Sequence, residues 1–146
     1  MSQFITLEDY DASIHREILD ALLRHDSPTE DSAIIEICED RAIDEMRSYM
    51  DKFYDCDAIF GATGTERNQL VLMMALDIAI YHIFCQHNPY KMSEVRKDLY
   101  NRAIEWLKAV AAGKITIAGA PRLPEEKLAQ NSPWQISSEE LRPTHL

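Results

Sequence analysis

The sequence has little of what tight hairpins, disulfide scaffolds or membrane anchors require. Only 4 glycines occur among its 146 residues, which leaves little material for many tight turns. Its three cysteines, Cys38, Cys56 and Cys85, form no C-x-x-C pair, and the opening segment lacks the basic start and apolar run of a signal peptide. We therefore expect free thiols in an intracellular protein. The longest apolar stretch, residues 70–85, contains Asp77 and His82 and is shorter than the roughly 20 residues of a membrane span. It predicts a buried helix and no membrane contact.

Positive charge is also scarce. The chain has 15 lysines and arginines against 25 aspartates and glutamates, a net charge of −10. Residues 1–60 hold 16 of the acids and 5 of the bases, whereas residues 61–120 hold 5 acids and 7 bases. The resulting negative field disfavours a lysine and arginine surface that grips nucleic acid or anionic lipid. An acidic patch could instead meet a neutral or basic patch on another copy of the chain.

Helical periodicity runs through most of the sequence and predicts an all-α fold of four main helices. Thr6 can cap a short turn over residues 7–10, and apolar residues then recur at helical spacing, which predicts a short first helix or two turns joined by a bend; they are Ile14, Ile18, Leu19, Leu22 and Leu23. Residues 27–30 (SPTE) have a capping serine, a first-turn proline and a glutamate, and they predict a second helix to about Lys52. Thr63 and Glu66 form a second capping pair, so we expect a third helix over residues 65–86. Ser93 can cap a fourth helix that ends at Gly113.

The third helix is apolar on nearly all sides from Leu70 onward, so we expect the other helices to surround it. In the second helix the acids should lie mostly opposite the apolar stripe; they are Glu36, Glu39, Asp40, Asp44 and Glu45.

Three segments break the periodicity. Residues 53–60 predict an ordered loop with aromatic anchors. Residues 114–117 alternate polar and apolar side chains and predict a short extended segment that could form a strand. From Gly119 four prolines fall among charges, so we expect a helical domain over residues 1–118 and an extended or disordered arm over residues 119–146.

Patterns for metal, phosphate or nucleophile chemistry are incomplete, so we expect no metal site, no cofactor and no enzymatic activity. Glu36, Asp40 and Asp44 recur every four residues, but no Glu-x-x-His spacing accompanies them, which favours a solvated helix face. Residues 61–66 (GATGTE) lack the lysine of a phosphate-binding loop and predict a turn and a helix cap. Cys85 and His82 could touch, yet a small buried apolar thiol is the favoured interpretation.

Asp77 is the one acid in the apolar third helix, and an unpaired buried charge would cost several kcal/mol. We expect Arg96 or Arg102 of the following helix to pair with it. The predicted structural clamp between the third and fourth helices consists of Asp77, Tyr81, Arg96, Tyr100, Arg102 and Trp106. A catalytic acid working with His82 or Cys85 is the less favoured alternative, and it requires a water-accessible pocket.

Several runs carry a family resemblance through their order and spacing. Residues 77–81 (DIAIY) are followed by Pro89, Arg96 and Tyr100, and then by residues 103–107 (AIEWL) and 111–115 (AAGKI). Residues 5–10, 43–54 and 59–60 fit as well. Over residues 4–118 the chain resembles a family of small Mu-like phage and prophage proteins, and the resemblance does not cover the tail.

The resemblance implies a structural virion protein with no catalytic residue. Members look like head–tail connector or neck subunits, which form a ring beneath the portal and join the DNA-filled head to the tail. The implied partners are other copies of the chain, the portal and tail-completion proteins, and DNA passes through the channel without specific binding. We expect the protein in the host cytoplasm during assembly and then in the virion. The expected partner contacts are Lys114, Ile115, Ile117 and Trp134. A helical protein–protein interaction module unrelated to virions is the alternative.

Overall fold

The computed structural model describes residues 4–13, 28–87 and 92–131. Within them the chain forms six α-helices and one 3-10 turn, and no strand, so the predicted all-α class is confirmed. The elements are α1 (Leu7–Ser13), α3 (Pro28–Met50), α4 (Cys56–Gly61), the turn η1 (Gly64–Glu66), α5 (Gln69–His87), α6 (Glu94–Ala111) and α7 (Glu125–Asn131). The apolar residues expected to extend the first helix beyond Ser13 lie outside the described part of the chain.

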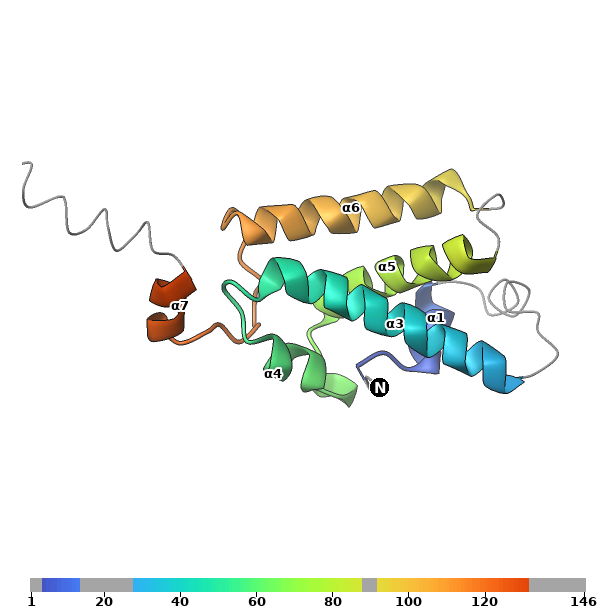
Figure 1. Cartoon of the computed structure of the whole chain (residues 1–146), viewed down its shortest axis with the longest axis horizontal. Coiled ribbons are helices and arrows are strands. Elements are labelled where there is room, and N and C mark those ends of the chain that lie inside the picture. Colours follow the sequence, from blue (N-terminus) through green and yellow to red (C-terminus); the bar gives the residue numbers. More distant parts are fainter. Residues whose placement is uncertain (1–3, 14–27, 88–91, 132–146) are drawn as a thin grey trace, which may run out of the picture.

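Helix α5 is the centre of the fold (Figure 1). It packs against α3, α6 and α1, and α3 also contacts α6 and α4. Figure 1 shows α3 and α6 running in the same direction and α5 running against both. Of the described helices, α5 alone is long and apolar enough to cross a membrane, and 61% of that window, Gln69–Gln86, is buried inside the protein. Its packing among three helices accounts for this composition.

Polar side chains cap the starts of α5 and α6, although the predicted start of α5 is wrong. Thr63 makes no capping hydrogen bond, and η1 follows it. Helix α5 instead begins after Asn68, whose Oδ1 accepts hydrogen bonds from the backbone N–H of Leu70 and of Val71, both at 3.1 Å. The predicted cap of α6 is confirmed, because Ser93 Oγ accepts from the N–H of Arg96 at 3.2 Å.

Two short helices replace segments expected to be irregular. Residues 56–61 form α4 within the expected aromatic loop, and the Asp55 side chain caps it by accepting from the N–H of Ala58. Residues 125–131 form α7 in the expected arm. The segments that precede these two helices are hydrogen-bonded to each other. The N–H of Asp55 donates to the Pro121 carbonyl, and the N–H of Leu123 donates to the Phe53 carbonyl, both at 3.0 Å. The division at residue 118 stays a prediction, and residues 132–146 lie outside the described part.

The segment between α6 and this pairing forms no strand. Ile117 is 2% exposed, and its N–H donates to the hydroxyl of Tyr54 at 2.8 Å. Gly113 ends α6 with φ of +76°, in the left-handed region. The N–H of Lys114 donates to the Ala109 carbonyl and the N–H of Gly113 to the Val110 carbonyl, the paired bonds of a Schellman motif.

Replacement of Gly113 by alanine should lower the free energy of unfolding by about 1 kcal/mol. A side chain in the left-handed region costs about 1–2 kcal/mol, and the smaller entropy of the unfolded alanine chain offsets part of that cost. Gly61→Ala is the matched control, because Gly61 does not have a positive φ and nothing lies within 4 Å of an added Cβ. Urea unfolding of both variants measures the difference. Equal stabilities would contradict the assigned helix end.

Candidate functional site

Asp77 of α5 is held by two arginines of α6. Its Oδ2 accepts a hydrogen bond from Arg102 at 2.7 Å, and its Oδ1 lies 3.4 Å from the Arg96 guanidinium. Asp77 is 5% exposed. Burial raises the pKa of its carboxyl above the ordinary value, although Arg102 and Arg96 act to lower it. The structure thus brings together the three charged members of the predicted clamp.

The aromatic members of the predicted clamp lie in a separate cluster. Tyr81 of α5 stacks on Tyr100 of α6, with ring centroids 3.8 Å apart and planes 13° apart. The Tyr100 hydroxyl donates to Glu45 Oε1 at 2.9 Å, and His82 Nε2 lies 3.0 Å from Glu45 Oε2. Glu45 belongs to α3, so this cluster joins all three long helices. Burial, and then the hydrogen bond to Glu45, raise the pKa of Tyr100.

This arrangement changes the roles expected for several residues. The helical pattern predicts Glu45 on the solvent face of its helix, but Glu45 is half-buried and is contacted by both His82 and Tyr100. Little in the sequence indicates that Glu45 is half-buried, because its partners, Tyr100 and His82, are distant in the chain. In the enzyme alternative Asp77 works with His82 or Cys85, but His82 pairs with Glu45 and Cys85 with Tyr81, while Asp77 pairs with arginines. Trp106 is half-buried and packs against the apolar core.

The cysteines differ in exposure. Cys38 and Cys56 are buried and Cys85 is exposed, so the expectation that Cys85 is a buried thiol is wrong. Burial raises the pKa of Cys56 to about 12. Cys85 lies beside Tyr81, and their side-chain hydrogen bond raises the pKa of that tyrosine. In the described part of the chain no group of three histidine, cysteine or acidic side chains could hold a metal ion.

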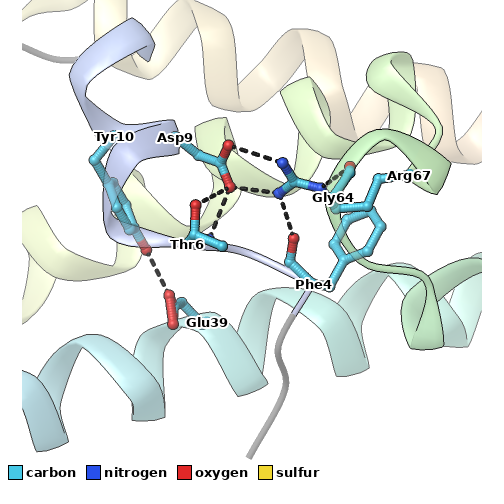
Figure 2. Close-up of polar contacts among 7 residues, drawn as sticks. All are labelled: Phe4, Thr6, Asp9, Tyr10, Glu39, Gly64 and Arg67. Carbon is cyan, nitrogen blue, oxygen red and sulfur yellow. Dashed lines mark hydrogen bonds and ion pairs between the residues drawn. The ribbon is translucent and has the colours of Figure 1, made fainter.

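A third cluster, which the sequence did not reveal, fastens the N-terminal segment to the body (Figure 2). Asp9 accepts hydrogen bonds from the backbone N–H and the hydroxyl of Thr6, at 2.7 and 3.0 Å. Arg67 donates to both oxygens of Asp9 and also to the Phe4 carbonyl, at 2.7 Å, and the Gly64 carbonyl, at 2.8 Å. Burial acts to raise the pKa of Asp9, but the bonds from Arg67 and Thr6 outweigh it and lower the pKa. Residues 58 positions apart are thereby joined.

The same segment reaches α3 through a buried hydrogen bond. The Tyr10 hydroxyl donates to Glu39 Oε2 at 3.1 Å (Figure 2). Tyr10 is 1% and Glu39 7% exposed, so the expectation that Glu39 lies on the solvent face is wrong. Burial raises the pKa of Glu39 to about 7; the Tyr10 bond opposes that rise, and the charges of Asp40, Glu36 and Asp9 add to it. The helical period alone could not separate Glu39 from its exposed neighbours.

A basic aromatic pocket lies at the other end of the fold, where α6 ends. It has a volume of about 290 Å³ and is lined by Phe53, Tyr54, Val110, Ala112, Gly113, Ile115, Thr116 and Arg122. The Arg122 guanidinium lies 5.8 Å from the Phe53 ring centre and 5.6 Å from that of Tyr54, and Lys52 Nζ lies 5.3 Å from that of Phe53. Cation–π attraction holds both cations against the pocket wall.

The residues expected to contact partners differ in exposure: two lie on the surface at this pocket and one is buried. Ile115 lines it and is 39% exposed, and Lys114 is exposed beside it in the chain. Ile117, by contrast, is packed in the core and offers no surface, which corrects its expected role. Trp134 lies outside the described residues.

Together, the fold and these clusters define a small helical protein whose buried polar groups join one helix to another. The sequence places it among proteins of Mu-like phages. It matches the family described as Bacteriophage Mu, Gp36 over residues 4–133, and the chain therefore belongs to that family. The match extends 15 residues beyond the resemblance at residue 118 and includes α7. No curated protein and no solved structure matches the chain.

Replacement of Asp77 by alanine should lower the free energy of unfolding by about 2–3 kcal/mol, because it leaves the guanidinium of Arg96 and its remaining contacts without the buried carboxylate. Arg102 is half exposed and loses less. Asp98→Ala removes an exposed acid of α6 and should change stability by less than about 0.5 kcal/mol. Denaturant unfolding of both variants tests this. An Asp77→Ala protein as stable as the parent would contradict the structural clamp.

Stability should also depend on the protonation of Glu39. The pKa of Glu39 is about 7 in the folded protein and near the ordinary glutamate value of 4.5 in the unfolded chain, so the folded state binds more protons between these values. The free energy of unfolding should therefore fall as pH rises from about 4.5 to 7, by on the order of 2–3 kcal/mol.

The variant Glu39→Gln cannot titrate, so the difference between parent and variant isolates this dependence. Asp44→Asn, which removes an exposed carboxyl from the same helix, serves as the control. Thermal unfolding from pH 4 to pH 8 gives both differences. If parent and Glu39→Gln curves run parallel, Glu39 does not titrate in this range.

Proposed function

We propose that this chain is a structural virion-assembly protein, a head–tail connector subunit that forms a ring beneath the portal. Its partners in this proposal are neighbouring copies, the portal and tail-completion proteins. It assembles in the bacterial cytoplasm, becomes part of the particle, and catalyses no reaction. The observation that carries the proposal is the family match, which covers residues 4–133 of the 146-residue chain.

The polar chemistry of the fold supports a structural role. Asp77, Glu45, Asp9 and Glu39 each face a partner on another element, so their carboxylates are used to hold helices together. A catalytic carboxylate has to reach a substrate, and these four are occupied by protein groups.

The net charge of −10 supports passage of DNA without capture. Tight binding of duplex DNA depends on cations that replace the counterions of the phosphates, and an acidic channel offers few. Such a channel lets DNA pass without holding it.

Removal of this gene from a Mu-like prophage should yield DNA-filled heads and free tails that are not joined. Electron microscopy of the induced lysate counts joined particles, and the gene supplied in trans should restore them. In complete particles, a ring of density below the portal should fit the α3, α5 and α6 body. Normal yields of infectious, tailed particles without the gene would contradict the proposal.

A further inference from the structure

Arg122 is presented as an unpaired cation at the mouth of the basic aromatic pocket. Its side chain is exposed, and its contacts within the described chain are the rings of Phe53 and Tyr54. No carboxylate among the described residues pairs with it. Its backbone is fixed by the bridge to Tyr54. A guanidinium stacked on aromatic rings keeps its N–H edge free and pre-oriented, and this edge matches a carboxylate.

The surroundings of Arg122 favour an acidic occupant. Lys52 lies over the same Phe53 ring, and the exposed Lys114 follows the pocket-lining Gly113. The pocket of about 290 Å³ is large enough for a side chain from another molecule. The site therefore fits a protein surface that carries carboxylates beside an apolar side chain.

The chain itself carries such a surface on α3. Asp40 and Asp44 are exposed and Glu36 is half-buried, at successive i, i+4 positions, and Ile37 among them is 49% exposed. No described cation pairs with Asp40 or Asp44. Arg41 is the cation on this stretch, so the three acids leave it net negative. We call Glu36, Ile37, Asp40 and Asp44 the acidic stripe.

The whole acidic stripe cannot face the pocket of its own chain. Asp44 precedes Met50, the last residue of α3, by six residues, but Ile37 precedes it by thirteen, which is about 20 Å along a rigid helix. Figure 1 shows the first half of α3, which includes Glu36 and Ile37, toward one end of the molecule and the end of α6, beside the pocket, toward the other. A contact that brings Ile37 and its neighbouring acids to the pocket therefore joins two copies, head to tail.

We propose that the acidic stripe of one subunit binds the pocket around Phe53, Lys52 and Arg122 of the next. The inference rests on the proposed function and names the ring contact: different patches meet, and such a heterologous contact closes into a ring when the rotation per subunit allows it. The stripe of a second copy suits the site better than DNA phosphates, because it offers the exposed apolar side chain of Ile37 to the aromatic and aliphatic pocket wall as well as carboxylates to Arg122.

Disulfide trapping tests the contact in the full-length chain. All variants carry Cys85→Ser, which removes the exposed thiol, and the trapped pair is Ile37→Cys with Ile115→Cys. The matched control pairs Ile115→Cys with Val95→Cys, because Val95 is 65% exposed but lies on α6. Oxidation should give a ladder of covalent oligomers from the trapped pair and at least tenfold less from the control pair or from either single cysteine.

Charge reversal in the trapped background tests the role of the carboxylates. Arg122→Glu should lower the ladder yield at least tenfold, and adding Asp40→Arg with Asp44→Arg should restore most of it. An unchanged ladder with Arg122→Glu overturns the proposal. So does binding of a duplex DNA oligonucleotide that requires Arg122 and prevents the ladder, which assigns the pocket to phosphate.

The oxidation is run on concentrated purified protein and on assembled particles. A ladder in either preparation supports the contact, and its absence from both overturns it. If neither preparation gives a ladder but the particles contain a ring of the chain, the contact is refuted and the proposed function stands. If purified protein gives a ladder but assembled particles do not contain the chain, the proposed function is refuted and the contact stands.

Discussion

The structure depends on covering a helix that is apolar on nearly all sides. Helices α3, α6 and α1 each cover one side of α5, and 61% of its Gln69–Gln86 window is buried. Burial of that surface is the main gain of folding. Asp77 is the exception within α5, and its presence fixes α6, because two arginines of that helix must meet one carboxylate. The stacked rings of Tyr81 and Tyr100 stabilise the same alignment of α6 along α5.

The features that could be predicted are those with a strong local or periodic signal. The apolar run identified α5, Ser93 and Gly113 marked the ends of α6, and the physics of a lone buried acid pointed from Asp77 to arginines of the next helix. Helix α4 could not be predicted in this way, because six residues are too few to establish a period. Asp55 could have revealed its start, since aspartate before a short apolar run is a capping signal. Asn68 similarly caps α5 where Thr63 and Glu66 offered a more familiar pattern.

The remaining surprises concern acids of α3, where helical position and actual burial diverge. Glu39 and Asp40 are adjacent, yet the first is buried against Tyr10 and the second is exposed. What decides between them is the position of α1, which is fixed by Arg67 and Asp9 across 58 positions of sequence. A periodic pattern describes one helix at a time, so it carries no information on a partner that a distant ion pair brings into place. The same reasoning applies to Glu45, whose partners come from α5 and α6.

Some acids of α3 have partners inside the fold, and those without a partner in the described part of the chain indicate where another molecule could bind. Glu39 and Glu45 are neutralised or bonded inside the fold, whereas Asp40 and Asp44 repel each other one turn apart on an exposed face. Like charges at this spacing destabilise a helix by a few tenths of a kcal/mol. No described cation forms an ion pair with Asp40 or Asp44, and no described carboxylate pairs with Arg122. Both deficits lie on the surface, and within the described part of one chain Arg122 pairs with neither Asp40 nor Asp44. A contact between copies meets both, and it does so without drawing on the buried polar groups that hold the helices together.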